Sequence, residues 1–127
     1  MAYLIDTDVM VDVSRRNAEA ANYVDSLSDA WIAIVTAHEL IVGARDKRDV
    51  AGIDSLIALY PVVHINDRIG MLAYDLLKTY AKSHGLRTFD SLIAATALDA
   101  GFTLVTRNRK HFGIIDGIRL QVPPYQT

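Results

Sequence analysis

Short runs of apolar residues alternate with stretches of helical periodicity along the whole chain. Residues 3–5, 31–35, 62–65, 103–106 and 118–122 have the composition of strands, and helical patterns separate the first four of them. Two strands that are joined through a helix usually run parallel, and repetition of this unit gives a sheet with helices on both faces. The alternation therefore predicts an α/β fold with a doubly wound, mainly parallel sheet.

Residues that begin and end helices mark the boundaries between these strands. Thr36 and Glu39 have the spacing of a capping box, so we predict a helix that begins at Thr36. Asn66 is expected to cap a helix that ends at Gly85, a residue suited to the left-handed conformation. Segment 89–100 is apolar on nearly all sides, which predicts a buried helix with Thr88 free to cap it.

The composition bounds the class of protein. The chain has 127 residues, of which 51% are hydrophobic and 22% charged, so we expect one folded domain over residues 1–127. No apolar run reaches the ~20 residues that a membrane-spanning helix needs, so we expect no membrane contact and a cytoplasmic location. The absence of cysteine excludes disulfides, thiolate catalysis and cysteine-ligated zinc.

The net charge of −2 counts against sequence-independent binding of long nucleic acids, which usually needs a basic surface. It does not count against an enzyme that acts on nucleic acid. An acidic cluster for metal ions lowers the total charge while basic residues elsewhere bind phosphates.

Three acidic residues lie at strand-to-helix junctions that are far apart in the sequence: Asp6, Glu39 and Asp90. Each of the first two has a structural explanation, because Asp6 can cap a helix and Glu39 can belong to the capping box. Asp90 differs, since it heads the most apolar helix, where an uncompensated carboxylate is costly to bury.

The three junctions are expected at one edge of the sheet, because ligands of open α/β sheets gather beyond the carboxyl ends of the strands. Carboxylates brought together there repel one another unless cations hold them. Oxygen ligands suit Mg²⁺ or Mn²⁺. The pattern therefore predicts a metal site for phosphodiester chemistry, with all three carboxylates within a few ångström of one another.

The segment after the fourth predicted strand is polar and basic. Thr106 and Asn108 are expected to point toward the same edge of the sheet, while Arg107, Arg109 and Lys110 follow directly. A solvated basic loop would explain these residues without any function. The alternative is that Thr106 and Asn108 form a polar floor for the metal site and that the three cations bind phosphates of a substrate.

Four segments, in this order and with this spacing, resemble the PIN-domain family, and within it the VapC toxins of toxin–antitoxin pairs. The resemblance covers essentially the whole chain and implies a three-layer α/β/α sandwich. The four segments are Leu4-Ile5-Asp6-Thr7-Asp8-Val9, Thr36-Ala37-His38-Glu39-Leu40, Thr88-Phe89-Asp90-Ser91-Leu92-Ile93-Ala94-Ala95-Thr96-Ala97 and Leu104-Val105-Thr106-Arg107-Asn108-Arg109-Lys110-His111-Phe112.

The resemblance implies a Mg²⁺- or Mn²⁺-dependent endoribonuclease that forms a homodimer and is inhibited by a cognate antitoxin. Carried over by motif, Asp6, Glu39 and Asp90 are the metal ligands and catalytic acids. The remaining site residues are then Asp8 and Asn108 as additional ligands, Thr7 and Thr106 as residues that orient the carboxylates, and Arg107, Arg109 and Lys110 as contacts to RNA.

The chain departs from the family pattern in the last segment, where the family often has a fourth acid and this chain has Asn108 and His111. Because of this departure, the sequence does not decide whether a second metal ion binds. The departure also supports an alternative, a degenerate PIN domain that binds RNA or protein without catalysis. The opening Asp6-Thr7-Asp8 also resembles haloacid-dehalogenase phosphohydrolases, but Met10 does not fit their pattern. A phosphoacceptor receiver domain fails because strand 62–65 ends without an aspartate.

Overall fold

The computed structural model describes residues 1–125, and a parallel sheet of five strands forms its centre. The strand order is β3-β2-β1-β4-β5, and every neighbouring pair is parallel. The strands are β1 (Tyr3–Ile5), β2 (Ala30–Ala33), β3 (Val62–Val63), β4 (Thr103–Val105) and β5 (Leu120–Gln121). The predicted fold class is therefore confirmed.

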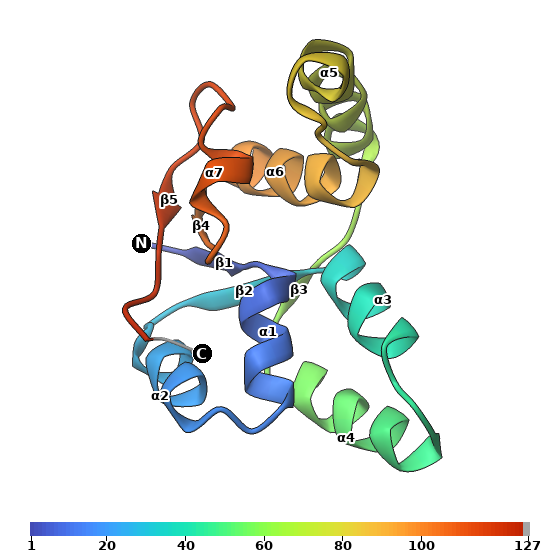
Figure 1. Ribbon diagram of the computed structural model, residues 1–127, viewed down its shortest axis with the longest axis vertical. Coiled ribbons are helices and arrows are strands. Elements are labelled where there is room, and N and C mark those ends of the chain that lie inside the picture. The colour runs from blue at the N-terminus through green and yellow to red at the C-terminus, as the bar shows by residue number, and fades with distance from the viewer. Residues whose placement is uncertain (126–127) are drawn as a thin grey trace.

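Helices cover both faces of this sheet, which gives three layers (Figure 1). Helices α1, α2 and α4 lie on one side and α5 and α6 on the other, with α3 at the carboxyl end of β2. The helices are α1 (Thr7–Ser14), α2 (Ala18–Ser26), α3 (Ile34–Val42), α4 (Lys47–Ile57), α5 (Asp67–His84), α6 (Thr88–Ala100) and the short α7 (Arg109–Phe112).

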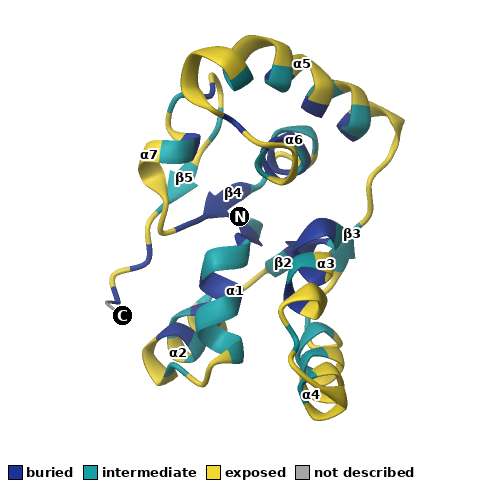
Figure 2. Ribbon diagram, turned by 45° about the vertical axis from the view of Figure 1, so that its right-hand side comes forward, coloured by how far each residue is buried: buried dark blue, intermediate teal, exposed yellow. Residues whose placement is uncertain are grey.

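The alternation of side chains along the strands separates two hydrophobic cores. Leu4 and Leu104 pack with α5 and α6, whereas Ile5 and Val105 pack with α1 and α2. Successive strand residues point to opposite faces, so one apolar run serves both cores. Figure 2 shows the result, with buried residues concentrated in the strands and α6.

The boundary between β2 and α3 differs from the predicted one. The helix begins at Ile34 and not at Thr36, and its N-cap residue Ala33 makes no side-chain capping bond. The predicted capping box of Thr36 and Glu39 is therefore wrong. The β-branched run 34–36 favours a strand locally, but Val35 and Thr36 are buried in the helix, and tertiary packing overrides that preference.

The other helix ends are closer to the prediction. The side chain of Asn66 accepts a hydrogen bond from the backbone N–H of Ile69, and Gly85 ends α5 with a φ of 71°. Thr88 is the first residue of α6 and not its cap. In the described part of the chain, residues 1–125, no helix is long and apolar enough to cross a membrane.

Candidate functional site

Asp6 lies directly beyond the end of β1 and is held from both sides. Its Oδ1 accepts a hydrogen bond from the Thr7 backbone N–H at 2.8 Å, and its Oδ2 accepts one from the Thr106 hydroxyl at 2.7 Å. Its backbone N–H donates to the carbonyl of Val105, so β4 fixes the backbone too. Thr106 thus makes the contact expected of a residue that orients this carboxylate.

Asp6, which is buried, and Asp8, which is partly buried, form a carboxyl pair. Burial, and then the charge of Asp8, raise the pKa of Asp6 from 3.8 to about 8. Burial likewise raises the pKa of Asp8. Among the described residues no hydrogen-bond donor reaches Asp8 Oδ1, although this oxygen is buried. A buried acceptor without a donor is costly, so this oxygen requires a proton or a cation.

Thr7 holds Glu39 of α3, and Thr36 in turn contacts Thr7. The Thr7 hydroxyl donates to Glu39 Oε1 at 2.7 Å and lies 3.0 Å from the Thr36 hydroxyl. A hydroxyl has one proton, so Thr36 must be the donor to Thr7. The second predicted orienting residue, Thr7, therefore contacts a predicted metal ligand, and it joins that residue to the helix that Asp6 caps.

Asp90 lies in the first turn of α6 and is engaged by a histidine. His111 Nε2 lies 2.7 Å from Asp90 Oδ2, and both side chains are mostly buried. Arg87 approaches the same oxygen at 3.8 Å. Asp90 and Glu39 both line a pocket of about 350 Å³ together with residues 87–89, so these two acids face a common space.

The three acids therefore lie at the same end of the sheet, but their carboxylates do not meet directly. Within residues 1–125, no three histidine or acidic side chains lie close enough together to form a complete metal site. The expected convergence within a few ångström is wrong in this respect. Thr7 holds Glu39 and His111 holds Asp90, so a separate neighbour engages each of these two carboxylates, while Asp6 interacts with Asp8.

The basic residues after β4 divide into two groups. Arg107 is held close to α1, because its Nη1 lies 3.1 Å from Asp12 Oδ2 and its backbone N–H donates to Asp8 Oδ2. Arg109 and Lys110 are exposed on α7. Asn108 Oδ1, expected as an additional metal ligand, accepts the backbone N–H of His111 and caps α7.

Three residues that hold the site were not assigned this role from the sequence: Asp12, Tyr125 and His111. Tyr125 donates a hydrogen bond to Asp12 Oδ2 at 2.7 Å, and the two residues are far apart in the sequence. Asp12 follows Asp8 by one helical turn, which was the one local signal that both could lie on the same face of α1.

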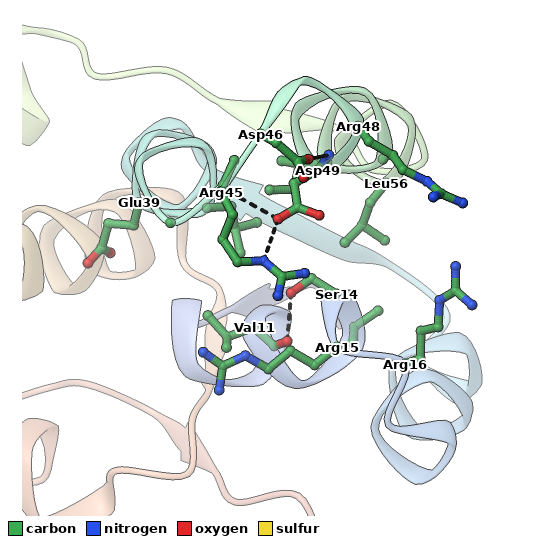
Figure 3. A pocket seen from close by; sticks show the side chains of 16 residues that line it. Val11, Ser14, Arg15, Arg16, Glu39, Arg45, Asp46, Arg48, Asp49 and Leu56 are labelled. Carbon is green, nitrogen blue, oxygen red and sulfur yellow. Dashed lines mark hydrogen bonds and ion pairs between the residues drawn. The ribbon is translucent and has the colours of Figure 1, made fainter.

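A second, larger groove of about 1160 Å³ lies between α1, α3 and α4 and begins at Glu39 (Figure 3). Its floor contains apolar side chains such as Val11, Leu40 and Leu56, and four arginines surround it. Arg45 pairs with Asp49 at 2.8 Å. Because Glu39 lines both the groove and the smaller pocket, the two spaces adjoin at this residue.

The donor set fits a hard divalent cation that keeps part of its water. Asp6 and Asp8 offer carboxylate oxygens side by side, and Asp8 Oδ1 lacks a donor in the described residues. Mg²⁺ binds through one or two carboxylates while it retains several waters. Glu39 and Asp90 could then reach the cation through water, and the absence of cysteine leaves a set dominated by oxygen.

Comparisons with known proteins identify relatives along the whole chain. Ribonuclease VapC19 of Mycobacterium tuberculosis is 29% identical over 127 residues, which cover 96% of this chain and 98% of that protein. Ribonuclease VapC1 of Methanocaldococcus jannaschii is 27% identical over 111 residues, which cover 86% and 77%.

Solved structures agree in fold. A toxin–antitoxin complex from Klebsiella pneumoniae matches with a TM-score of 0.83 at 25% identity, over 99% of this chain and 100% of that one. VapBC2 from Rickettsia felis, bound to a promoter DNA fragment, matches with a TM-score of 0.84 at 21% identity, over 96% and 98%. The sequence profile of the PIN domain matches residues 3–117. The chain therefore belongs to the PIN domain family.

Proposed function

We propose that this chain is a Mg²⁺- or Mn²⁺-dependent endoribonuclease and the toxin of a VapBC-type toxin–antitoxin pair. The observation that carries the proposal is the carboxyl pair of Asp6 and Asp8, in which Asp8 Oδ1 is a buried oxygen that no donor reaches among the described residues. Thr7, between these two aspartates, contacts Glu39, which shares a pocket with Asp90. The relatives named Ribonuclease VapC support the reaction class, and membership of the PIN domain family supports the site.

Each acid has a defined role in this proposal. Asp6 and Asp8 would hold the cation directly, while Glu39 and Asp90 would hold its water ligands. A bound divalent cation polarises the scissile phosphate and lowers the pKa of a coordinated water. Thr106 and Thr7 keep the carboxylates of Asp6 and Glu39 in fixed orientations, as residues around a metal ligand commonly do.

Further residues would bind the substrate and position it. Arg109 and Lys110 are exposed close to His111, which contacts Asp90, so their charges would bind RNA phosphates beside the site. Arg107 is already engaged with Asp12 and Asp8, and its charge offsets those carboxylates. We therefore assign RNA binding to Arg109 and Lys110 before Arg107.

Metal dependence is the direct test. We expect RNA cleavage by the purified protein in the presence of Mg²⁺ or Mn²⁺ and loss of cleavage in EDTA, with recovery when excess metal is added back. The reason is that, without a cation, the acids at this edge repel the phosphate. Cleavage that persists undiminished in EDTA would contradict the proposal.

The alternative of a non-catalytic PIN domain is not favoured. It would be supported by loss of the acids, yet Asp6, Glu39 and Asp90 are all present and each is held by a hydrogen bond from a neighbouring side chain. The haloacid-dehalogenase and receiver-domain readings are discarded, because the chain belongs to another family.

A cognate antitoxin is proposed to inhibit by placing a basic side chain at the acids. A bidentate arginine paired with Asp6 or Asp90 would replace the cation without imitating RNA. The adjoining groove between α1, α3 and α4, with its apolar floor, would take the neighbouring part of the partner. Structures of relatives as VapBC complexes support such a partner.

This mechanism predicts competition between antitoxin and metal. We expect the affinity for Mn²⁺, measured by calorimetry, to fall at least about 10-fold when the antitoxin is saturating, because an arginine removes the ligand charge. The matched control is the antitoxin with that arginine replaced by glutamine. If saturating antitoxin blocks cleavage and leaves Mn²⁺ affinity unchanged, inhibition acts on RNA access instead.

A homodimer also remains a prediction. Met71 and Tyr74 of α5 are 61% and 57% exposed, and such apolar side chains on one helix suit an interface. We expect sedimentation at tens of micromolar protein to give the mass of a dimer, and a monomer at that concentration would refute it.

A further inference from the structure

The segment that follows β5 places a buried tyrosine, Tyr125, against residues of α1 and α2. Tyr125 is 9% exposed and packs in the core that contains α1 and α2, with its ring centroid 6.4 Å from that of Tyr23. Its hydroxyl donates to Asp12 Oδ2 at 2.7 Å. Burial, followed by the hydrogen bond to Asp12, raises the pKa of Tyr125, so the phenol keeps its proton and remains a donor.

Asp12 connects this tyrosine to the residue that follows Thr106. Arg107 Nη1 lies 3.1 Å from Asp12 Oδ2, which is the same oxygen that Tyr125 binds. The Arg107 guanidinium also lies over the Tyr125 ring, with its central carbon 6.0 Å from the ring centroid. Tyr125 therefore acts on Arg107 in two ways. Its ring contacts the guanidinium directly, and its hydroxyl binds the Asp12 oxygen with which Arg107 is paired.

Arg107 in turn holds Asp8. Its backbone N–H donates to Asp8 Oδ2 at 3.1 Å, while Oδ1 of the same carboxylate is the buried oxygen without a donor in the described residues. One oxygen of Asp8 is thus fixed by the backbone of Arg107 and the other remains available to a cation. A continuous series of contacts runs from Tyr125 through Asp12 and Arg107 to Asp8.

Charge explains why this series is needed. Asp8 and Asp12 lie one turn apart on α1, so their carboxylates repel, and Arg107 is a cation that contacts both. More than a third of the Arg107 side chain is exposed, and a partly exposed ion pair fixes a side chain weakly. The buried phenol adds a directional hydrogen bond and a ring face, which restrict where Asp12 and Arg107 can lie.

We propose that Tyr125 is a positioning residue for the metal site, which acts through Asp12 and Arg107 to fix Asp8 with one oxygen free for a cation. This inference rests on the proposed function in one respect, the role of Asp8 as a metal ligand. The contacts among Tyr125, Asp12, Arg107 and Asp8 do not depend on that function. It assigns a role at the site to a residue 117 positions beyond Asp8 in the sequence, outside the matched PIN segment.

The first test does not involve metal. Tyr125→Phe is compared with Tyr23→Phe, which removes a neighbouring hydroxyl that Gln121 Nε2 binds and leaves the contacts of Asp12 intact. We expect hydrogen exchange of the Arg107 amide, followed by NMR, to accelerate several-fold in Tyr125→Phe and to stay at the wild-type rate in Tyr23→Phe. Equal exchange rates in the two variants overturn the proposal.

The second test measures the site itself. We expect calorimetry to show Mn²⁺ binding about 3- to 10-fold weaker in Tyr125→Phe and unchanged in Tyr23→Phe, since residues behind a metal ligand commonly alter affinity by such factors or more. A purely structural role would lower the melting temperature of both variants and leave affinity equal, which overturns the proposal. Absence of Mn²⁺ binding in the wild-type protein would instead refute the proposed function, and the Arg107 amide would still decide the positioning role.

A third variant tests whether the contacts act in series. Asp12→Asn weakens the ion pair with Arg107 and should also weaken Mn²⁺ binding. If Tyr125 acts through Asp12, the double variant Tyr125→Phe with Asp12→Asn should bind Mn²⁺ no more weakly than Asp12→Asn alone. Fully additive losses would show that the two residues act independently, contrary to the proposal.

Discussion

Replacement of Asp90 by asparagine is expected to reduce RNA cleavage by at least about 100-fold, since changes to residues behind a metal ligand already cost about 10- to 100-fold. The substitution preserves the shape of the side chain and removes its charge. His111 can still contact the amide, so the local structure of α6 should persist. The lost charge no longer offsets the cation or polarises its water, which affects the reaction step and lowers kcat more than it raises KM.

Asp99→Asn is the matched control for this experiment. Asp99 lies on the same helix and pairs with Arg68 at 3.0 Å, far along α6 from the site. Initial rates of RNA cleavage by Asp99→Asn should stay within about two-fold of the wild type, because a surface ion pair contributes little to stability. If Asp90→Asn cleaves at the wild-type rate, the activity comes from a contaminating nuclease or from a different site.

Most of the fold could be predicted because strands of a parallel sheet are buried on both faces. Segment 3–5 is continuously apolar, and segment 103–105 is apolar except for the buried Thr103, which is typical of strands in the middle of a parallel sheet. The start of α3 could not be predicted, since Ile34 and Val35 have the composition of a strand. Only their packing against α5, α6 and the sheet, which is a tertiary effect, makes them helical.

The site was predictable in part for a related reason. Thr7 and Thr106 lie next to strand ends, so the edge of the sheet determines what they reach, and they do contact Glu39 and Asp6. The meeting of the three carboxylates was not observed, because rotamers depend on neighbours such as His111. The position of Tyr125 depends on the path of the segment after β5, which brings it to Asp12 and for which the sequence has no local signal.

Replacement of Asp6 by asparagine is expected to abolish cleavage and, in EDTA, to stabilise the protein. Asp6 has its pKa raised from 3.8 to about 8, so in that interval the folded protein keeps a proton that the unfolded chain releases. The unfolded state therefore binds fewer protons, and stability falls as the pH rises between these values. Because the pKa is raised by burial and by the charge of Asp8, a wild-type protein that is stable near pH 4 should lose stability progressively up to pH 8.

Asparagine at position 6 avoids the cost of a buried charge, but it has one acceptor oxygen where aspartate has two. The amide oxygen can accept from either the Thr7 N–H or the Thr106 hydroxyl, and the lost bond costs about 1–3 kcal/mol because the donor left behind is buried. The relief of desolvation and of repulsion from Asp8 is larger, so the balance favours the variant. We expect the melting temperature of Asp6→Asn in EDTA to exceed that of the wild type by several degrees at pH 8, and the difference to disappear near pH 4.

Metal should reverse the order of stability. A cation bound between Asp6 and Asp8 stabilises the folded state by mass action, so excess Mg²⁺ should raise the melting temperature of the wild type and leave that of Asp6→Asn nearly unchanged. Asp54→Asn, which alters an exposed aspartate on α4, should respond to Mg²⁺ and to pH as the wild type does. If Asp6→Asn melts below the wild type at pH 8 in EDTA, burial and the charge of Asp8 do not destabilise the ionised Asp6 carboxylate as we expect. We expect Asp6→Asn to melt above the wild type under these conditions, because carboxylates that serve a function are often held close together at a cost in stability.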